Sequence, residues 1–210
     1  MAKCHFAIIP AAGRSERMQG PHKLLLPWHN ESIIQRVLQT WMDSNVAQVL
    51  VVIRADDAPL SAHVDELKGR FTWNRLKILR PQTAPPAMKE SVCCGLSDLQ
   101  SSVAPNDDDR WLLAPADVPS LSTDVIDHVI NVSNTTDQIV AAMYGDHQSH
   151  PVSFPWRLAD DVKELPAESG INSLLGTHVV EHVRLPHELY PGDIDTPGEY
   201  ESALRAFRRE

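Results

Sequence analysis

Residues 4–23 read CHFAIIPAAGRSERMQGPHK, an apolar run followed by a loop of small, hydroxyl and basic residues. The run Cys4–Ile9 is typical of a buried strand. In the loop Pro10–Lys23, small side chains let backbone N–H groups approach a phosphate, and a hydroxyl and two basic side chains add donors and charge. These residues are Ala11, Ala12 and Gly13, then Ser15, then Arg17 and Lys23. The segment therefore predicts a site for the phosphates of a nucleotide.

Two common phosphate-binding patterns do not fit this loop. A P-loop needs four residues between its glycines and then Lys-Ser or Lys-Thr, whereas here six residues separate Gly13 from Gly20 and Lys23 precedes Leu24. The dinucleotide fingerprint Gly-x-Gly-x-x-Gly is also absent. The alternative is a basic surface loop with an incidental glycine. The strand context, together with small residues, Arg and Lys, favours the phosphate site.

Further along the chain, apolar β-type runs alternate with stretches of helical period, which predicts a mostly parallel sheet covered by helices on both faces. The expected strands are Cys4–Ile9, Gln48–Ile53, Leu76–Leu79, Trp111–Ala114, Gln138–Met143 and Val179–Leu185. The expected helices are Ser32–Asp43, Leu60–Lys68, Lys89–Leu99, Thr123–Val132, Trp156–Leu165 and Pro197–Arg208. We expect one α/β domain over residues 1–210, Rossmann-like and three-layered, with ligands beyond the carboxyl ends of the strands.

Composition narrows the class of protein. The formal net charge is −9, which argues against binding nucleic acid, because that needs a basic face. Apolar runs are too short to span a membrane, and the N-terminal run is too short for a signal peptide, so we expect a cytoplasmic protein. The three cysteines suggest neither a disulfide framework nor a zinc site, since no Cys-x-x-Cys occurs.

A carboxylate follows the expected strand Trp111–Ala114. Asp117 stands in an Asp-x-Pro turn, and Mg²⁺ commonly takes one or two protein carboxylates together with substrate phosphates. The alternative is that Asp117 caps the next helix, but Ser122 or Thr123 suits the cap better. The run Asp107-Asp108-Asp109 is interpreted as a solvated turn rather than a metal site.

The segment PAAGRSERM, followed after four residues by KLL, resembles the signature of the MobA-like NTP transferase family. The resemblance spans nearly the whole chain and implies a fold of the nucleotide-diphospho-sugar transferase type. It implies that the loop wraps an NTP and that Asp117 holds Mg²⁺. It also implies that Ser91, in KESVCCGL, contacts the base or ribose. The implied nucleotide-binding residues are Pro10, Ala11, Ala12, Gly13, Arg14, Ser15, Arg17, Lys23 and Ser91.

The segment DIDTP (193–197) resembles the family's Asp-x-Asp-Thr-Pro motif. Asp195 is therefore a candidate second metal contact, although Asp195 or Thr196 could equally be a helix cap before Pro197. HPVSF (150–154) resembles the family's His-Pro-Val-x-Phe segment, which lies toward the acceptor. His150 and Pro151 are accordingly candidate acceptor contacts, and a purely structural histidine is equally open.

Departures from the family concentrate on the acceptor side. Ser149 replaces a glycine, and Cys93 stands where an arginine is frequent. In AESGIN (167–172), Glu168 replaces Asp and Asn172 replaces Arg, which removes a bidentate cation.

The resemblance implies transfer of an NMP to a phosphate-bearing acceptor with release of pyrophosphate, and molybdopterin is the first acceptor to consider. Arg17, Lys23 and Asp117 are the expected catalytic residues, and Mg²⁺ the expected cofactor. Ala12 stands where guanylyl-transferring members of the family carry a second glycine, and Ala-Ala-Gly resembles the cytidylyl-transferring members. A methyl group there is expected to narrow the base pocket, which favours CTP over a purine nucleotide. The alternatives are a sugar or alcohol phosphate as acceptor, or a catalytically silent nucleotide-binding or chaperone protein. The oligomeric state cannot be inferred from the sequence.

Overall fold

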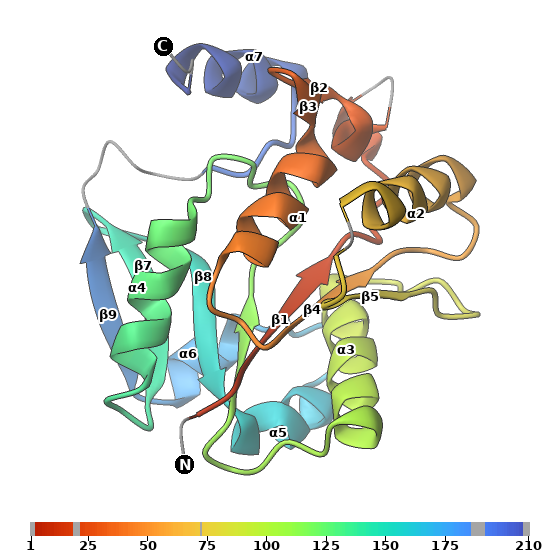
Figure 1. The fold of residues 1–210 in the computed structure, drawn as a ribbon. Helices are drawn as coiled ribbons and strands as arrows, with labels where there is room; N and C mark the ends of the chain where they lie inside the picture. The colour runs from red at the N-terminus through yellow and green to blue at the C-terminus, as the bar shows by residue number, and fades with distance from the viewer. Residues whose placement is uncertain (1–2, 19–21, 72, 186–191, 208–210) are drawn as a thin grey trace.

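The computed structural model describes residues 3–18, 22–71, 73–185 and 192–207. A seven-stranded sheet forms the centre of the molecule, in the order β5-β4-β1-β6-β8-β7-β9 (Figure 1). The strands are β1 (His5–Pro10), β4 (Gln48–Val52), β5 (Leu76–Leu79), β6 (Arg110–Leu113), β7 (Ile139–Tyr144), β8 (His147–Pro155) and β9 (Val180–Leu185). β8 pairs antiparallel with β6 and β7, and the other pairings are parallel. The mostly parallel sheet expected from the sequence is confirmed.

β1 lies inside the sheet, with all six of its residues buried. Parallel neighbours on both sides, β4 and β6, explain why this strand is a continuous apolar run rather than an alternating one. Phe6 and Ile8 face one core, and Ala7 and Ile9 face the other. The strand therefore fixes the loop after Pro10 at the carboxyl edge of the sheet.

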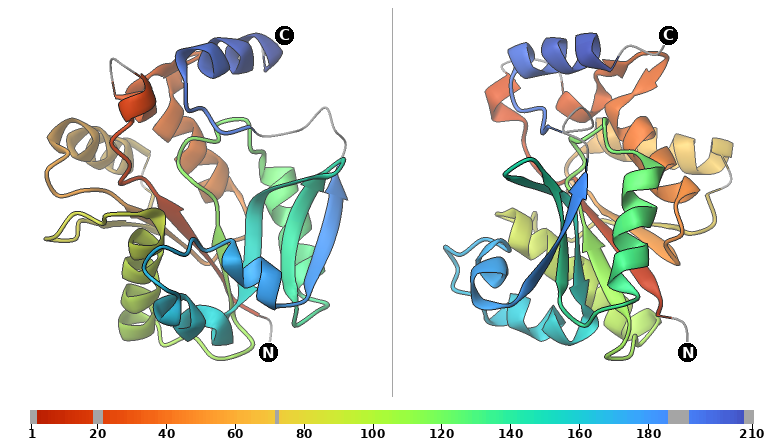
Figure 2. Two further views of the ribbon diagram at one scale, coloured as in Figure 1. Left: turned by 180° about the vertical axis from the view of Figure 1, so that it is seen from behind. Right: turned by 90° about the vertical axis from the view of Figure 1, so that its left-hand side faces the viewer.

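Helices cover both faces, so the expected three-layer arrangement is also confirmed. Residues of α1 (Ile33–Asp43), α2 (Ala58–Phe71) and α4 (Thr123–Ser133) belong to one core. Residues of α3 (Met88–Ser102), α5 (Ala159–Glu164) and α6 (Ser173–Thr177) belong to the other. Figure 2 shows α4 on one side of the sheet and α5 with α6 on the other.

The expected elements agree with the structure except in a few places, among them the short strands β2 (Pro27–Trp28) and β3 (Glu31–Ser32), which were not expected. β8 is absent from the expected strands, because polar residues and two prolines interrupt its apolar pattern. The expected helix Trp156–Leu165 is a 3₁₀ turn, Trp156–Leu158, followed by α5. The short α6 was not expected, and Arg208, the predicted end of the last helix, lies outside the described residues.

The last helix, α7 (Pro197–Ala206), lies against residues from the first part of the chain. It lies beside the small hairpin of β2 (Pro27–Trp28) and β3 (Glu31–Ser32) in Figure 1. The Tyr200 hydroxyl donates to the Pro27 carbonyl, and the Trp28 and Phe207 rings lie 6.4 Å apart between centroids. This docking brings the residues just before α7 against the loop after β1.

The acidic run before β6 is a structural turn. Asp107 and Asp108 are exposed, whereas Asp109 is buried and its carboxylate accepts from the backbone N–H groups of Cys4 and Asn106. Among the described residues no group of three or more His, Cys, Asp or Glu side chains is arranged to hold a metal ion. None of the described helices is long and apolar enough to cross a membrane.

Candidate active site

The loop after β1 and the loop after β6 meet at the carboxyl edge of the sheet. Ala11 N donates to Val52 O at 2.9 Å, and Ala116 N donates to Pro10 O at 3.2 Å. The start of the loop Pro10–Lys23, called the phosphate loop from here on, is thereby held between β4 and the loop after β6. Adjacent parallel strands are the reason that two motifs about a hundred residues apart come together.

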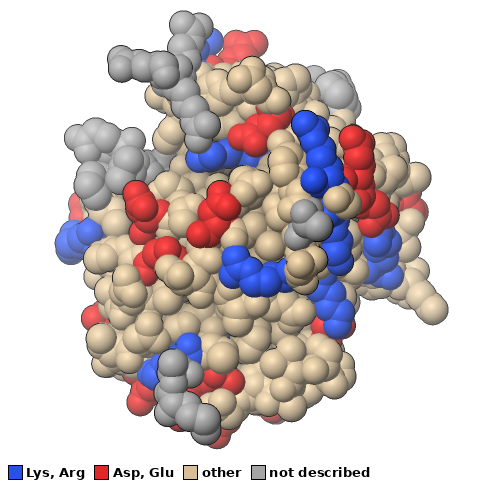
Figure 3. Space-filling model, viewed as in Figure 1, with Lys and Arg blue, Asp and Glu red and all other residues tan. Residues whose placement is uncertain are grey.

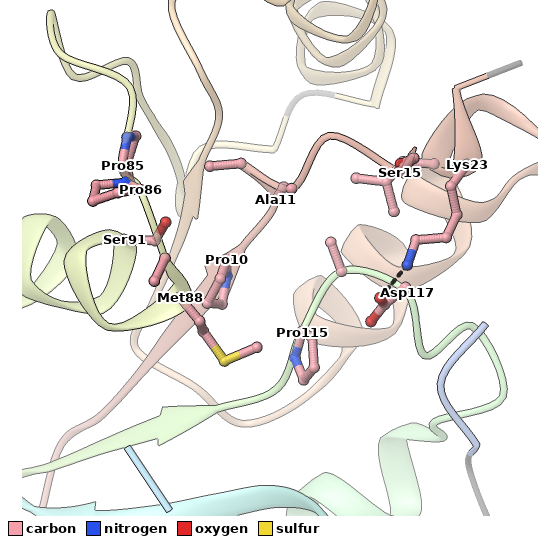
Figure 4. A pocket seen from close by; sticks show the side chains of 15 residues that line it. Pro10, Ala11, Ser15, Lys23, Pro85, Pro86, Met88, Ser91, Pro115 and Asp117 are labelled. Carbon is pink, nitrogen blue, oxygen red and sulfur yellow. Dashed lines mark hydrogen bonds and ion pairs between the residues drawn. The ribbon is translucent and has the colours of Figure 1, made fainter. Parts of the chain in front are cut away.

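Lys23 and Asp117 form the centre of the site. The Lys23 Nζ atom lies 2.6 Å from Asp117 Oδ2 and 3.1 Å from Asp195 Oδ1. Figure 4 shows the lysine reaching from its loop to the aspartate on the opposite loop. Burial opposes the charge on Lys23, but the two carboxylates outweigh it and raise its pKa. The site therefore holds its lysine fully charged.

Asp195, whose position relative to Asp117 the sequence left open, lies at the same site. Ile194 N donates to Asp117 O at 3.1 Å, and Arg17 Nη2 lies 2.9 Å from Asp195 Oδ2. Neither aspartate is a helix cap, because Ser122 caps α4 and Thr196 caps α7 in a capping box with Glu199. Both carboxylates therefore face the basic residues of the site rather than a helix end.

Two cavities meet at Lys23 and Asp117. The first, about 180 Å³, is lined mainly by apolar and small residues of the loops after β1 and β6 and of the start of α3. The second, about 510 Å³, is lined mainly by polar and charged residues, both basic and acidic. All nine sequence-predicted nucleotide-binding residues line one or both of them. Pro10, Ala11 and Ser91 line the first, Arg14 and Arg17 the second, and Ala12, Gly13, Ser15 and Lys23 both.

The shapes of the two cavities suit the two ends of a nucleotide. The small cavity places Ser91, a buried residue of α3, beside Pro86 and Met88 (Figure 4). The larger cavity carries the exposed Arg14 and Arg17 side chains. A base or ribose fits the first environment and a chain of phosphates the second.

Sequence reasoning missed some of the residues that line these cavities. Arg54 lines the larger one, and Pro85, Pro86 and Met88 line the smaller one. Arg54 follows β4 at the same sheet edge as the phosphate loop, and this position was the signal that could have identified it.

Asp117 has an oxygen suited to a cation. Its Oδ1 atom is buried and finds no hydrogen-bond partner among the described residues, while Oδ2 holds Lys23. An ionised carboxylate oxygen accepts hydrogen bonds and binds cations, and Mg²⁺ needs few protein ligands when substrate phosphates supply the rest. Asp117 and Asp195 therefore fit a divalent cation that arrives with a nucleotide.

A third, polar cavity of about 180 Å³ is lined by Gln148, Ser149, His150, Asn172 and Asp193. The His150 Nδ1 atom is buried without a hydrogen-bond partner in the described part of the chain, and burial lowers the pKa of this histidine. Pro151 is buried in β8 and is not among the residues lining the cavity. Burial, together with the negative charges of Asp117 and Asp195, raises the pKa of Asp193 to about 6.

Charges on the face seen in Figure 3 are mixed. Lysine and arginine side chains lie interspersed with acidic ones rather than in one basic area. That no nucleic acid binds remains a prediction from the net charge.

Comparisons with known proteins agree with this geometry. The model of the MobA-like NTP transferase domain matches residues 7–183, and the chain belongs to this family of nucleotidyltransferases. No match was found among curated protein sequences.

Solved structures share the fold over nearly the whole chain. Rv0371c from Mycobacterium tuberculosis H37Rv is 20% identical with a TM-score of 0.79, covering 98% of this chain and 100% of that one. A nucleotidyl transferase from Methanothermobacter thermautotroptrophicus is 19% identical, with a TM-score of 0.77 and 97% of each chain covered. A 4-diphosphocytidyl-2C-methyl-D-erythritol synthase from Anaerococcus prevotii DSM 20548 is 16% identical, with a TM-score of 0.75 and coverage of 99% and 97%. A second structure of Rv0371c is a complex with manganese.

Proposed function

We propose that this nucleotidyltransferase-family protein transfers CMP from CTP to a phosphate-bearing acceptor and releases pyrophosphate. The observation that carries the proposal is the meeting of Lys23, Asp117 and Asp195 between a small apolar cavity and a larger charged one. The reaction needs no protein nucleophile, because an acceptor phosphate oxygen attacks the α-phosphorus directly. The protein lowers the barrier by aligning two anions and neutralising charge.

The residues have distinct roles in this mechanism. Lys23 and Arg17 neutralise the phosphates and the departing pyrophosphate, Lys23 as a point charge and Arg17 with paired donors. Asp117 and Asp195 would hold Mg²⁺, which supplies further neutralisation of phosphate charge when bound. Ser15 and the backbone N–H groups of Ala12, Gly13 and Arg14 complete the phosphate cradle.

The choice of CTP rests on the small cavity. Ala12 is buried and lines both cavities, so its methyl group takes space beside the base. A pyrimidine fits the remaining space better than a purine. The relative named as a 4-diphosphocytidyl-2C-methyl-D-erythritol synthase gives further support to a cytidine nucleotide.

Molybdopterin is the acceptor implied by the resemblance and is the first to test. His150 would donate to the acceptor phosphate, and Pro151 would position His150. A sugar or alcohol phosphate is the second candidate, and the polar cavity favours it. No lysine or arginine occurs among the described residues that line this cavity, and Asn172 lies there in place of the family's arginine.

Pyrophosphate release tests these proposals together. CTP, GTP, ATP and UTP are each incubated with Mg²⁺ and the protein, with molybdopterin, with a panel of sugar and alcohol phosphates, or with no acceptor. We expect release with CTP and one acceptor class, and its loss with EDTA. An NTP that binds without pyrophosphate release under any condition would instead identify a silent nucleotide-binding or chaperone protein.

A further inference from the structure

Arg54, which is not part of the phosphate loop, hydrogen-bonds to the backbone of that loop. Its Nη1 atom donates to the carbonyl oxygens of Ala12 at 3.1 Å and Gly13 at 3.0 Å. The side chain is only 11% exposed, although it lines the larger cavity. These hydrogen bonds fix two successive peptides at the start of the loop.

Asp57 joins this arginine to the other end of the loop. Its side chain is 3% exposed, and its Oδ2 atom lies 3.4 Å from Arg54 Nη2 and 2.8 Å from His22 Nε2. Its Oδ1 atom accepts from the backbone N–H of Leu60 in the first turn of α2 at 3.3 Å. A buried carboxylate with all these donors is satisfied and rigidly placed.

His22 links Asp57 to Lys23, the proposed catalytic lysine. The Leu24 N–H donates to His22 Nδ1 at 3.3 Å, so the ring proton is on Nε2 and is donated to Asp57. His22 immediately precedes Lys23, whose ammonium group contacts Asp117. The hydrogen bonds therefore run from the Ala12 and Gly13 carbonyls to the residue that precedes Lys23.

The direction of the peptides gives this network a consequence for binding. In a trans peptide the N–H points opposite to the carbonyl, so the N–H groups of Gly13 and Arg14 point away from Arg54. A Cβ atom added at Gly13 would meet no atom within 4 Å, so the backbone there borders open space. Donors fixed before the ligand arrives need no reorganisation when it binds.

We propose that Asp57 is a positioning residue for the triphosphate, which through Arg54 and His22 holds both ends of the loop in the conformation that binds an NTP. This proposal rests on the proposed function, because it assigns the loop to an NTP. It predicts an effect on NTP affinity rather than on the acceptor.

The first test is at His22, which lies outside the buried start of α2. His22→Ala removes the donor to Asp57 and is expected to raise the KM for CTP and the Kd for CTP by about tenfold, with little change in the KM for the acceptor. His22→Gln places an amide donor near the Nε2 position and is expected to restore most of the affinity. An unchanged affinity for CTP in His22→Ala overturns the proposal.

The second test compares two aspartates of the same region. Asp57→Asn is expected to raise the Kd for CTP at least tenfold, whereas Asp65→Asn, which breaks an exposed pair with Arg80 at 2.8 Å, leaves it unchanged. Binding is measured by calorimetry below the melting temperature of each variant. A lower melting temperature with wild-type CTP affinity would show a purely structural role and overturn the proposal.

If the wild type binds CTP but releases no pyrophosphate, the proposed function fails. The CTP affinities of the His22 and Asp57 variants still decide whether Asp57 is a positioning residue.

Discussion

Lys23 and Asp117 stand 94 positions apart in the chain, and their side chains meet at 2.6 Å. The pair joins the loop after β1 to the loop after β6, and Asp195 adds a second carboxylate from the segment before α7. One ammonium group thus contacts two carboxylates. The pair is the structural tie of the site, and the proposed mechanism assigns the chemistry to it.

Removal of either partner is expected to disable catalysis without unfolding the protein. Lys23→Ala and Asp117→Ala should each lower the rate of pyrophosphate release by on the order of 100-fold or more, because Lys23 would contact the reacting phosphates and Asp117 would hold the cation that neutralises them. Circular dichroism should show an intact fold. Lys77→Ala, which breaks the pair of Lys77 with Asp98 at 2.7 Å, is the control, since neither residue lines the three cavities of the site. Near-normal turnover in either site variant would contradict the assignment.

Lys23 should also compete with a divalent cation for the two carboxylates. Without nucleotide, Lys23→Met is therefore expected to bind Mn²⁺ more tightly than the wild type, by about tenfold or more, even though it is inactive. Lys77→Met makes the same change in net charge and frees another aspartate, so it measures the general electrostatic effect. Mn²⁺ binding can be followed by electron paramagnetic resonance. Equal affinities in the two variants would show that Asp117 and Asp195 do not form a cation site.

The base preference should depend on the methyl group of Ala12. Thermal-shift measurements with Mg²⁺ are expected to show greater stabilisation of the wild type by CTP than by GTP, ATP or UTP. Ala12→Gly enlarges the small cavity and should narrow the difference between CTP and GTP. Stronger stabilisation of the wild type by GTP would overturn the choice of CTP.

Acid sensitivity is expected from His5 in the centre of the sheet. Burial lowers the pKa of His5 to about 4, and the unfolded chain takes up the proton below about pH 6.5. The free energy of unfolding therefore falls as the pH drops from about 6.5 to about 4, by about 2 kcal/mol at pH 5.

Urea unfolding at pH 7.5 and pH 5 measures this contribution. Between pH 7.5 and pH 5, the free energy of unfolding of His5→Gln should fall by about 2 kcal/mol less than that of the wild type. His128→Gln, on the exposed side of α4, should retain the wild-type difference. A His5→Gln variant as acid-sensitive as the wild type would show that other groups control the loss of stability.

Much of the framework could be predicted from local patterns. β1 and β6 are continuous apolar runs because they are buried on both faces, and the motifs that follow them can be read directly from the sequence. β8 could not be predicted, because its nine residues include polar positions and prolines that only its antiparallel neighbours accommodate. Its burial is a property of its place in the sheet rather than of its own composition.

The sequence by itself determined the class of fold, and it singled out the loop Pro10–Lys23 and Asp117 as a candidate site, because these patterns depend on residues that are close together in the chain. Only the tertiary structure decided that Asp195, 172 positions after Lys23, contacts the same ammonium group. It also decided that Arg54 hydrogen-bonds the loop carbonyls and contacts Asp57. Such contacts depend on the order of strands in the sheet and on the docking of α7, and pairs this distant leave no local pattern in a single sequence.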